Sequence, residues 1–161
     1  MAFHKDLAFV FGGYPKTGRA AIRLGGKGDL GHDSLVWEDN HASYIPTPVV
    51  HDDKLYWVSD TGIAHCIDAQ TGKEIYRERL PGKVGGGKGK PIYASPVLAD
   101  GKLYCVTRLA GTFVIEAKPE FKVLAHNKIT NDETQFNATP AVSENALYLR
   151  SDSVLYALSS N

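Results

Sequence analysis

The sequence predicts an all-β chain: a β-propeller segment of about four blade-like units, forming an open arc or half of a larger ring. Three observations predict this fold. Short apolar runs are rich in Val, Ile, Tyr and Trp, turn residues separate them, and the pattern recurs at a spacing of roughly 40 to 50 residues. No stretch of ten or more residues has the apolar period of an α-helix, so we expect strands and loops throughout.

The clearest unit is the stretch 45–82, where four apolar runs alternate with turns rich in Asp and Gly. The runs are 47–50, 54–59, 63–67 and 74–78. Runs of about five residues with this composition are typical of β-strands. Connections this short join neighbouring strands antiparallel, since a parallel return needs a dozen or more residues. The stretch therefore predicts a four-stranded meander.

The same pattern recurs at 93–127 and again at 137–160. Each repeat opens with Ser or Thr before Pro and continues with a Leu-Tyr pair, whose tyrosines stand 48 and 44 residues apart: Tyr56, Tyr104 and Tyr148. In the second repeat, the run from Phe121 to Leu124 matches the Ile75-Tyr76 pair, and the last repeat stops before a fourth strand. Four-stranded repeats of this length are the signature of propeller blades.

The first segment, 7–39, supplies runs that match the second, third and fourth strands of a blade without its first strand. We therefore expect strands in the pattern 3+4+4+3. The whole chain, 1–161, is then one propeller segment. Its units are about 7–39, 45–82, 93–127 and 137–160.

Composition narrows the function classes. The chain has 18 basic and 18 acidic residues, which removes the general electrostatic argument for binding nucleic acid. No run approaches 18 apolar residues, so we expect no membrane span. Residues 1–6 lack the apolar middle region of a signal peptide, so we expect either a cytoplasmic chain or a true N-terminus further upstream.

The residue patterns of common enzyme sites are missing from the sequence. Cys66 and Cys105 occupy unlike positions in their units, which predicts two buried free thiols instead of a disulfide. The turn 51–53 (His-Asp-Asp) has metal-binding residue types, but the matching turns 99–101 and 143–145 keep turn residues and lose this set of ligands, so we expect a plain turn. No zinc-binding histidine pattern and no GxSxG motif occurs. We therefore expect no catalytic, cofactor-binding or metal-binding residues. These observations favour a protein that is not an enzyme.

Large aromatic side chains are expected to dock neighbouring blades. Trp37 and Tyr76 occupy equivalent places in fourth strands, where a ring can fill the wedge that opens toward the rim. Burial of such a ring stabilises an interface by roughly 2–3 kcal/mol. Tyr56 and Trp57 are neighbours in one strand, so they should face opposite sides of their sheet. We predict a structural docking role for Trp37, Trp57 and Tyr76.

The glycine-rich stretch 82–89 reads GxxxxGKG, close to the phosphate-binding motif GxxxxGK[ST]. Gly89 cannot supply the hydroxyl that holds magnesium, and a strand follows where the motif needs a helix. The stretch instead predicts a basic loop between blades, on one face of the ring. Its basic residues make it a candidate surface for a partner or ligand: Arg79, Lys83, Lys88 and Lys90.

Residues 66–76, CIDAQTGKEIY, resemble the docking motif AxDxxxGKxxW of pyrroloquinoline-quinone-like (PQQ-like) propeller repeats, with Tyr76 in place of Trp and Cys66 in place of Ala. The start SPV…DGKLY, within 95–104, resembles the same family. The resemblance covers about 150 residues. It implies a periplasmic or secreted protein and a ring of seven or eight blades. This chain would be a C-terminal portion of it.

The resemblance leaves three functions open. The first is a non-catalytic scaffold that presents loops to a protein or ligand, as in the lipoprotein that scaffolds outer-membrane barrel assembly. The second is part of a quinone-dependent oxidoreductase whose PQQ and calcium residues lie in missing blades. The third is a carbohydrate-binding propeller. An open fan would expose an apolar blade face, so we expect either a homodimer or missing N-terminal blades to complete the ring.

Overall fold

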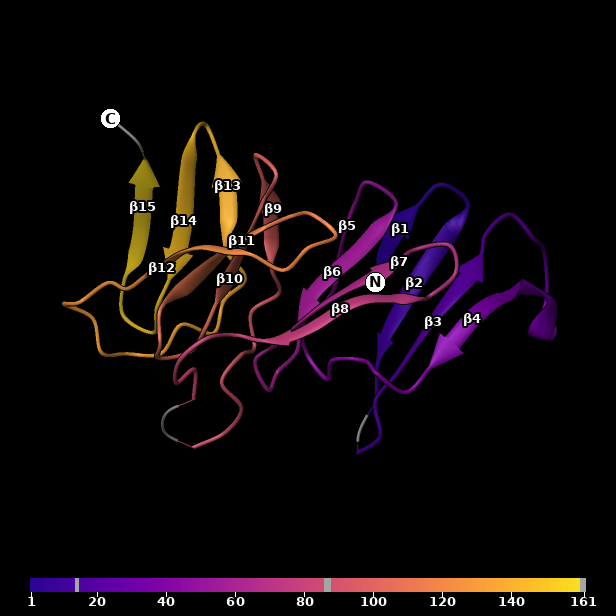
Figure 1. Ribbon diagram of the computed structural model, residues 1–161, viewed down its shortest axis with the longest axis horizontal. Helices are drawn as coiled ribbons and strands as arrows, with labels where there is room; N and C mark the ends of the chain where they lie inside the picture. The colour runs from indigo at the N-terminus through magenta and orange to yellow at the C-terminus, as the bar shows by residue number, and fades with distance from the viewer. Residues whose placement is uncertain (14, 86–87, 160–161) are drawn as a thin grey trace.

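The computed structural model describes residues 1–13, 15–85 and 88–159, and these form four separate antiparallel β-sheets. The sheets follow one another along the long axis of the molecule as an open row of blades (Figure 1). We number the blades 1 to 4 in chain order. The all-β fold and the division into propeller blades are thus confirmed.

Blade 1 corrects one expectation from the sequence, because its first strand is present. The described chain has strands in the pattern 4+4+4+3 instead of 3+4+4+3. The extra strand has only three residues and lacks the Ser/Thr-Pro start of the others, but Ala2 pairs with Phe9 and His4 with Leu7. The strands of blade 1 are β1 (Ala2–His4), β2 (Leu7–Gly12), β3 (Gly18–Arg23) and β4 (Leu35–Asp39).

Blades 2 and 3 are complete four-stranded meanders, and blade 4 ends after its third described strand. The strands of blade 2 are β5 (Val49–His51), β6 (Lys54–Val58), β7 (Ile63–Asp68) and β8 (Glu74–Arg79). Those of blade 3 are β9 (Val97–Ala99), β10 (Lys102–Val106), β11 (Thr112–Glu116) and β12 (Val123–Asn127). Those of blade 4 are β13 (Ala141–Ser143), β14 (Ala146–Arg150) and β15 (Leu155–Ser159).

Within residues 1–13, 15–85 and 88–159, helix is confined to one 3-10 turn, η1 (Gly31–Ser34), in the connection between β3 and β4. It contains no buried residue, so it takes no part in the core. No helix in the described part of the chain has the length and apolar character needed to cross a membrane.

The repeated Ser/Thr-Pro starts join the blades near the ring axis. The Thr47 amide donates to Ser95 Oγ at 2.9 Å, and the Ser95 amide donates to Thr139 Oγ1 at 3.1 Å. Beside these bonds, β1 lies against β5 and β9 lies against β13. Each hydroxyl therefore accepts from the preceding blade, which aligns the inner strands from blade 2 to blade 4.

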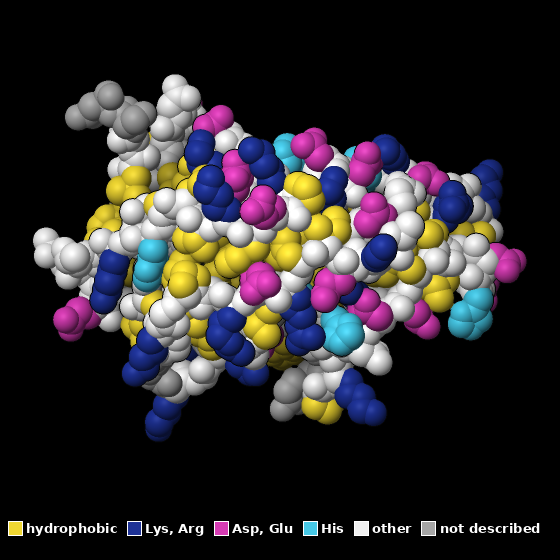
Figure 2. Space-filling view, in the orientation of Figure 1, with side chains coloured by type: hydrophobic (Ala, Val, Ile, Leu, Met, Phe, Trp, Pro, Cys, Tyr) yellow, Lys and Arg dark blue, Asp and Glu magenta, His cyan; other side chains and the backbone are white. Residues whose placement is uncertain are grey.

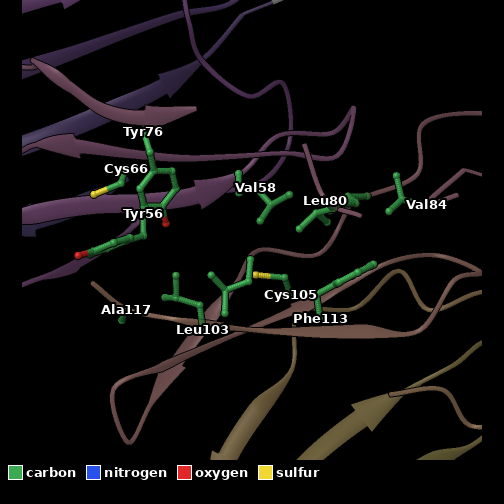
Figure 3. Packing of buried hydrophobic residues seen from close by; sticks show 13 residues of the cluster. Tyr56, Val58, Cys66, Tyr76, Leu80, Val84, Leu103, Cys105, Phe113 and Ala117 are labelled. Atoms are coloured by element: carbon green, nitrogen blue, oxygen red, sulfur yellow. The ribbon is translucent and has the colours of Figure 1, made fainter. Parts of the chain in front are cut away.

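Two apolar cores hold the first three blades together. Tyr56 belongs to the core between blades 2 and 3, and Trp57 belongs to the core between blades 1 and 2, as the alternation of a strand requires. Figure 3 shows the side chains of blades 2 and 3 pointing toward one another. Cys66 and Cys105 are buried free thiols in this core, which confirms that part of the prediction.

In each blade, the chain leaves for the next blade from the same end of the strands. We call the corresponding side of the molecule the connection face. It carries the turn between the second and third strands of every blade, because strands in a meander reverse direction at each turn. It also carries the three linkers, residues 40–48, 80–96 and 128–140. The opposite face carries the turns between first and second strands and between third and fourth strands.

Candidate functional site on the connection face

Of the four predicted basic residues, Lys83, Lys88 and Lys90 lie in the linker 80–96 on the connection face, and Arg79 is the last residue of β8. Arg79 Nη1 donates to the carbonyl of Thr61 at 3.5 Å, and Lys90 Nζ lies 3.4 Å from Asp60 Oδ2. Both residues therefore flank the turn between β6 and β7. Lys83 and Lys88 are exposed and form no ion pair within the described residues. Gly86 and Gly87, between them, lie outside the described residues.

Arg108 fixes the end of this loop. Its amide donates to the carbonyl of Pro91 at 2.9 Å, and its Nη1 donates to the carbonyl of Lys88 at 2.9 Å. Its guanidinium also lies over the Tyr93 ring, 4.7 Å from the ring centroid. The planar group has five N–H donors, so it can hold several backbone oxygens at once. The loop is therefore held to blade 3 at Lys88 and beyond.

The same arginine reaches the next linker. Arg108 Nε donates to Asn137 Oδ1 at 2.8 Å, and Nη2 donates to Gln135 Oε1. The Phe136 amide donates to the carbonyl of Arg108 at 3.0 Å. One side chain thus joins the linkers before and after blade 3 into a continuous surface.

A depression of about 410 Å³ lies on the connection face between blades 1 and 2. Its rim comes from the turn before β3, the linker 40–48 and the linker 80–96, and its floor comes from β7 and β8. The lining includes both charge signs and two aromatic rings. Its main residues are Thr17, His41, Tyr44, Asp60, His65, Arg77, Lys90 and Tyr93. Lys90 is the member of the predicted basic loop that reaches this depression.

His65 is the most unusual residue of the depression. It is only 5% exposed and stacks on Trp57 with a ring separation of 4.5 Å. Burial, together with the positive charges of Arg19 and Arg77, lowers the pKa of His65 to about 3. The imidazole is therefore neutral at physiological pH. Its buried Nδ1 has no hydrogen-bond partner among the described residues.

A second cavity, of about 430 Å³, lies between blades 3 and 4 and is mainly apolar. Its walls include Tyr104, Val114, Leu147 and Leu158. Tyr156 Oη donates to Asp132 Oδ2 at 2.7 Å at its edge. Hydrogen bonds from Ser151, Thr134 and Tyr156 hold the pKa of the Asp132 carboxyl well below its usual value.

The three aromatic residues proposed to dock blades lie at the blade interfaces. Trp37 Nε1 donates to the carbonyl of Ala69 in blade 2 at 3.0 Å. Trp57 contacts Phe11 of blade 1 edge to face, with ring centroids 5.0 Å apart. Tyr76 packs against Phe121 of blade 3, with ring centroids 5.6 Å apart.

Strand register shows which residue replaces the ring in blade 3. Trp37 pairs with Ala21, Tyr76 with Cys66, and Ala125 with Val114, at equivalent positions beside a bulge in each sheet. The expected match of the run from Phe121 to Leu124 with Ile75-Tyr76 therefore ends one residue too early, because Ala125 is the residue that pairs as Tyr76 does. Ala125 supplies no ring at this position, and the rings of the third interface come from elsewhere: Phe136 stacks on Tyr156 with ring centroids 6.2 Å apart.

The quinone-dependent alternative places its PQQ and calcium residues in missing blades, so the described residues bear here only on the two cysteines and on groups of metal-binding side chains. Burial raises the pKa of the Cys66 thiol to about 11 and that of Cys105 to about 12. Both thiols lie in the apolar core between blades 2 and 3, away from the connection face. Among residues 1–13, 15–85 and 88–159, no three His, Cys, Asp or Glu side chains gather where they could hold a metal ion.

Comparison with known proteins decides the family. A family model described as "Outer membrane protein assembly factor BamB" matches residues 28–119, which is more than half of the chain. The chain belongs to this family. A comparison of the sequence with curated proteins found no match.

Solved structures with the same fold include members of two functional classes. BamB from Moraxella catarrhalis is 14% identical, with a TM-score of 0.71 over 98% of this chain and 44% of BamB. A quinohemoprotein alcohol dehydrogenase, ADHIIG from Pseudomonas putida HK5, is 14% identical, with a TM-score of 0.63 over 92% of this chain and 28% of the enzyme. This chain thus spans less than half of either protein, and identities this low show the fold alone.

A third structural relative has nearly the same length as this chain. The computationally designed Ika4 protein is 12% identical, with a TM-score of 0.67 over 99% of this chain and 89% of Ika4. A chain of only about this size can therefore adopt the same arrangement of blades.

Several residues of the site were not predicted from the sequence. Arg108 stands in the turn of blade 3 that corresponds to Asp60 in blade 2, and His65 stands at the strand position that Phe113 fills in blade 3. Comparison of equivalent repeat positions would have found both, because Arg108 stands where blade 2 has the acidic Asp60 and His65 stands where blade 3 has the apolar Phe113. Tyr93 gave no such signal, since it precedes the first strand of its blade.

Proposed function

We propose that the chain is a non-catalytic propeller segment that presents its connection face to a protein partner. The anchored linker 80–96 carries this proposal. Arg108 fixes it at Lys88 and Lys90, while the Lys83 and Lys88 ammonium groups are exposed and form no ion pair with the described residues. Because the chain is anchored at Lys88 and Lys90, the Lys88 part of the surface can bind with little loss of conformational entropy.

The partner that this surface suits has an acidic segment. Lys83 and Lys88 lie in the linker 80–96, and Arg79 ends β8 just before it. Among the described residues, only Lys90 of the four predicted residues has a carboxylate partner, Asp60. Elsewhere on the displayed surface, acidic and basic side chains are interspersed (Figure 2). A local basic loop on a surface of balanced charge favours specific recognition over general attraction.

Membership in the family described as an outer membrane protein assembly factor supports a scaffold over an enzyme. We propose that the partner is a component of the outer-membrane assembly machinery and that the chain acts in the periplasm. The remaining blades of the ring would come from a second copy or from a longer chain, because blades 1 and 4 each have an uncovered sheet face.

The experiment is a binding measurement with purified, immobilised outer-membrane assembly machinery as the target. We expect K83E/K88E to weaken binding of the chain about tenfold or more, and we expect wild-type binding to fall as salt rises. The matched control is K118E/K122E, which reverses two lysines in the turn between β11 and β12 on the opposite face. Equal affinity of wild type and K83E/K88E would contradict the proposal, as would an equal loss in the control.

A further inference from the structure

Two sheet faces of the described chain have no neighbouring blade. We call the face of a blade toward the preceding blade its leading face, and the other its trailing face. The leading face of blade 1 exposes Phe3 (61%) and Val10 (37%). The trailing face of blade 4 exposes Leu155 (66%). The equivalents of Val10 in blades 2 and 3, Trp57 and Cys105, are buried.

The internal interfaces follow one rule. A residue on the trailing face of the second strand meets a fixed position on the leading face of the next blade. Phe11 contacts Trp57 across the first interface. Val58 and Cys105 share the second core, and Val106 and Leu149 share the third.

The same rule shows which residues would meet if the trailing face of blade 4 packed on the leading face of a blade 1. In strand register, Arg150 pairs with Leu155 as Val58 pairs with Ala64, so Arg150 occupies the trailing position. The leading position in blade 1 belongs to Val10. The same rule places Tyr148, the equivalent of Tyr56, opposite Ala8, where a small side chain leaves room for the ring.

The charges on these two faces are complementary. Val10, Ala20 and Glu38 are successive partners across blade 1 and line a shallow depression of about 430 Å³. Glu38 and Arg150 are both exposed, and neither forms an ion pair with any described residue. A charged Arg150 replaces valine at the equivalent positions Val58 and Val106, so it needs a carboxylate when a blade covers it.

We propose that two copies of this chain join head to tail, with the trailing face of blade 4 on the leading face of blade 1. Arg150 then enters the depression beside Glu38 of the other copy. Two such joints close a ring of eight blades, as a head-to-tail contact does when its rotation closes. The inference deepens the proposed function, because it rests on the chain being a propeller segment and names a second copy as the source of the missing blades.

The test is sedimentation equilibrium across a concentration series. We expect wild type to have about twice the monomer mass of 17.5 kDa. Both R150E and E38R should raise the dissociation constant about tenfold or more, because each leaves a buried pair of like charges. The charge-swapped double variant R150E/E38R should recover most of this loss. Lys83→Glu, on the connection face, should leave self-association unchanged.

Three outcomes would contradict the proposed joint. The first is a wild-type chain that stays monomeric at every concentration. The others are single variants that associate as tightly as wild type, and a double variant whose dissociation constant does not return toward that of wild type. A monomeric wild type would mean that another protein or further blades cover the two faces. Masses well above a dimer would contradict a closed ring. Because K83E/K88E tests partner binding separately, failure of the joint can be told from failure of the scaffold function.

Discussion

Trp37 couples blade 1 to blade 2 through one ring and one hydrogen bond. Its Nε1 donates to the Ala69 carbonyl at 3.0 Å, and its ring lies over Gly72. Gly72 has φ +70°, and a Cβ there would lie 2.8 Å from Trp37 Cδ2. The glycine is therefore required both by the backbone of the turn and by the ring above it.

Substitution of Trp37 should reveal how much this contact contributes to stability. Trp37→Ala should lower the free energy of unfolding by about 3 kcal/mol, because a large ring is lost and a cavity remains. Trp37→Phe should cost less, about 1–2 kcal/mol, because it keeps most of the ring and loses the N–H donor. Urea unfolding measures both. A cost below about 1 kcal/mol for the alanine variant would refute the docking role.

His65 should make stability depend on pH between about 6.5 and 3. Unfolded histidine binds a proton near pH 6.5, whereas folded His65 resists protonation until its pKa of about 3. As pH falls through this window the unfolded state binds more protons, so stability falls by up to about 1.4 kcal/mol per pH unit.

The matched variant is His65→Phe, which carries the residue that blade 3 has at the equivalent position. Urea unfolding from pH 7 to pH 5 should show a falling stability in wild type and a flatter profile in the variant. This range lies above the titration of the carboxyl groups, including Asp53, whose pKa is lowered to about 2 by hydrogen bonds from Lys5 and His4. Parallel profiles would show that His65 is protonated in the folded chain.

At the scale of elements, the Ser/Thr-Pro starts set the alignment of one blade on the next. Ser95→Ala removes the acceptor of the Thr47 amide, so we expect a loss of about 1 kcal/mol in the free energy of unfolding. Ser95→Thr keeps a hydroxyl, as Thr139 does in the next blade, and should stay within about 0.5 kcal/mol of wild type. If both variants unfold alike in urea, the hydroxyl has no such role.

The strands were largely predictable because each repeat gives its own signal. Apolar runs and two-residue turns recur, and the turn residues Asp52 and Asp53 adopt the positive φ angles that such hairpins need. Alternation also placed Tyr56 and Trp57 in different cores. β1 was missed because three residues, with Phe3 exposed, resemble a frayed end more than a strand.

The candidate site was less predictable, because it depends on contacts between linkers. The basic loop could be seen as a cluster of lysines, but its anchor, Arg108, lies in another blade and acts through backbone carbonyls. Such contacts leave no pattern in the residues that accept them. The depression beneath His65 likewise needs two blades to be in place before it exists.

At the scale of the whole molecule, each blade is a separate sheet that is stabilised by its neighbours. In such an array, the free energy of unfolding comes partly from each blade alone and partly from the interfaces between blades. The terminal blades have one interface each and are therefore the least stable. β6 and β7 in blade 2 are buried along most of their length, whereas β15 in blade 4 is mainly exposed. At the left end of Figure 2, near β14 and β15, hydrophobic side chains reach the surface.

Native-state hydrogen exchange on the R150E chain, at a concentration where it is monomeric, tests this arrangement of stacked blades most directly. The account predicts the slowest exchange in β6, β7, β10 and β11, and progressively faster exchange toward β1 at one end and toward β13 to β15 at the other. Equal protection in all four sheets, as in one cooperative sandwich or barrel, would contradict it.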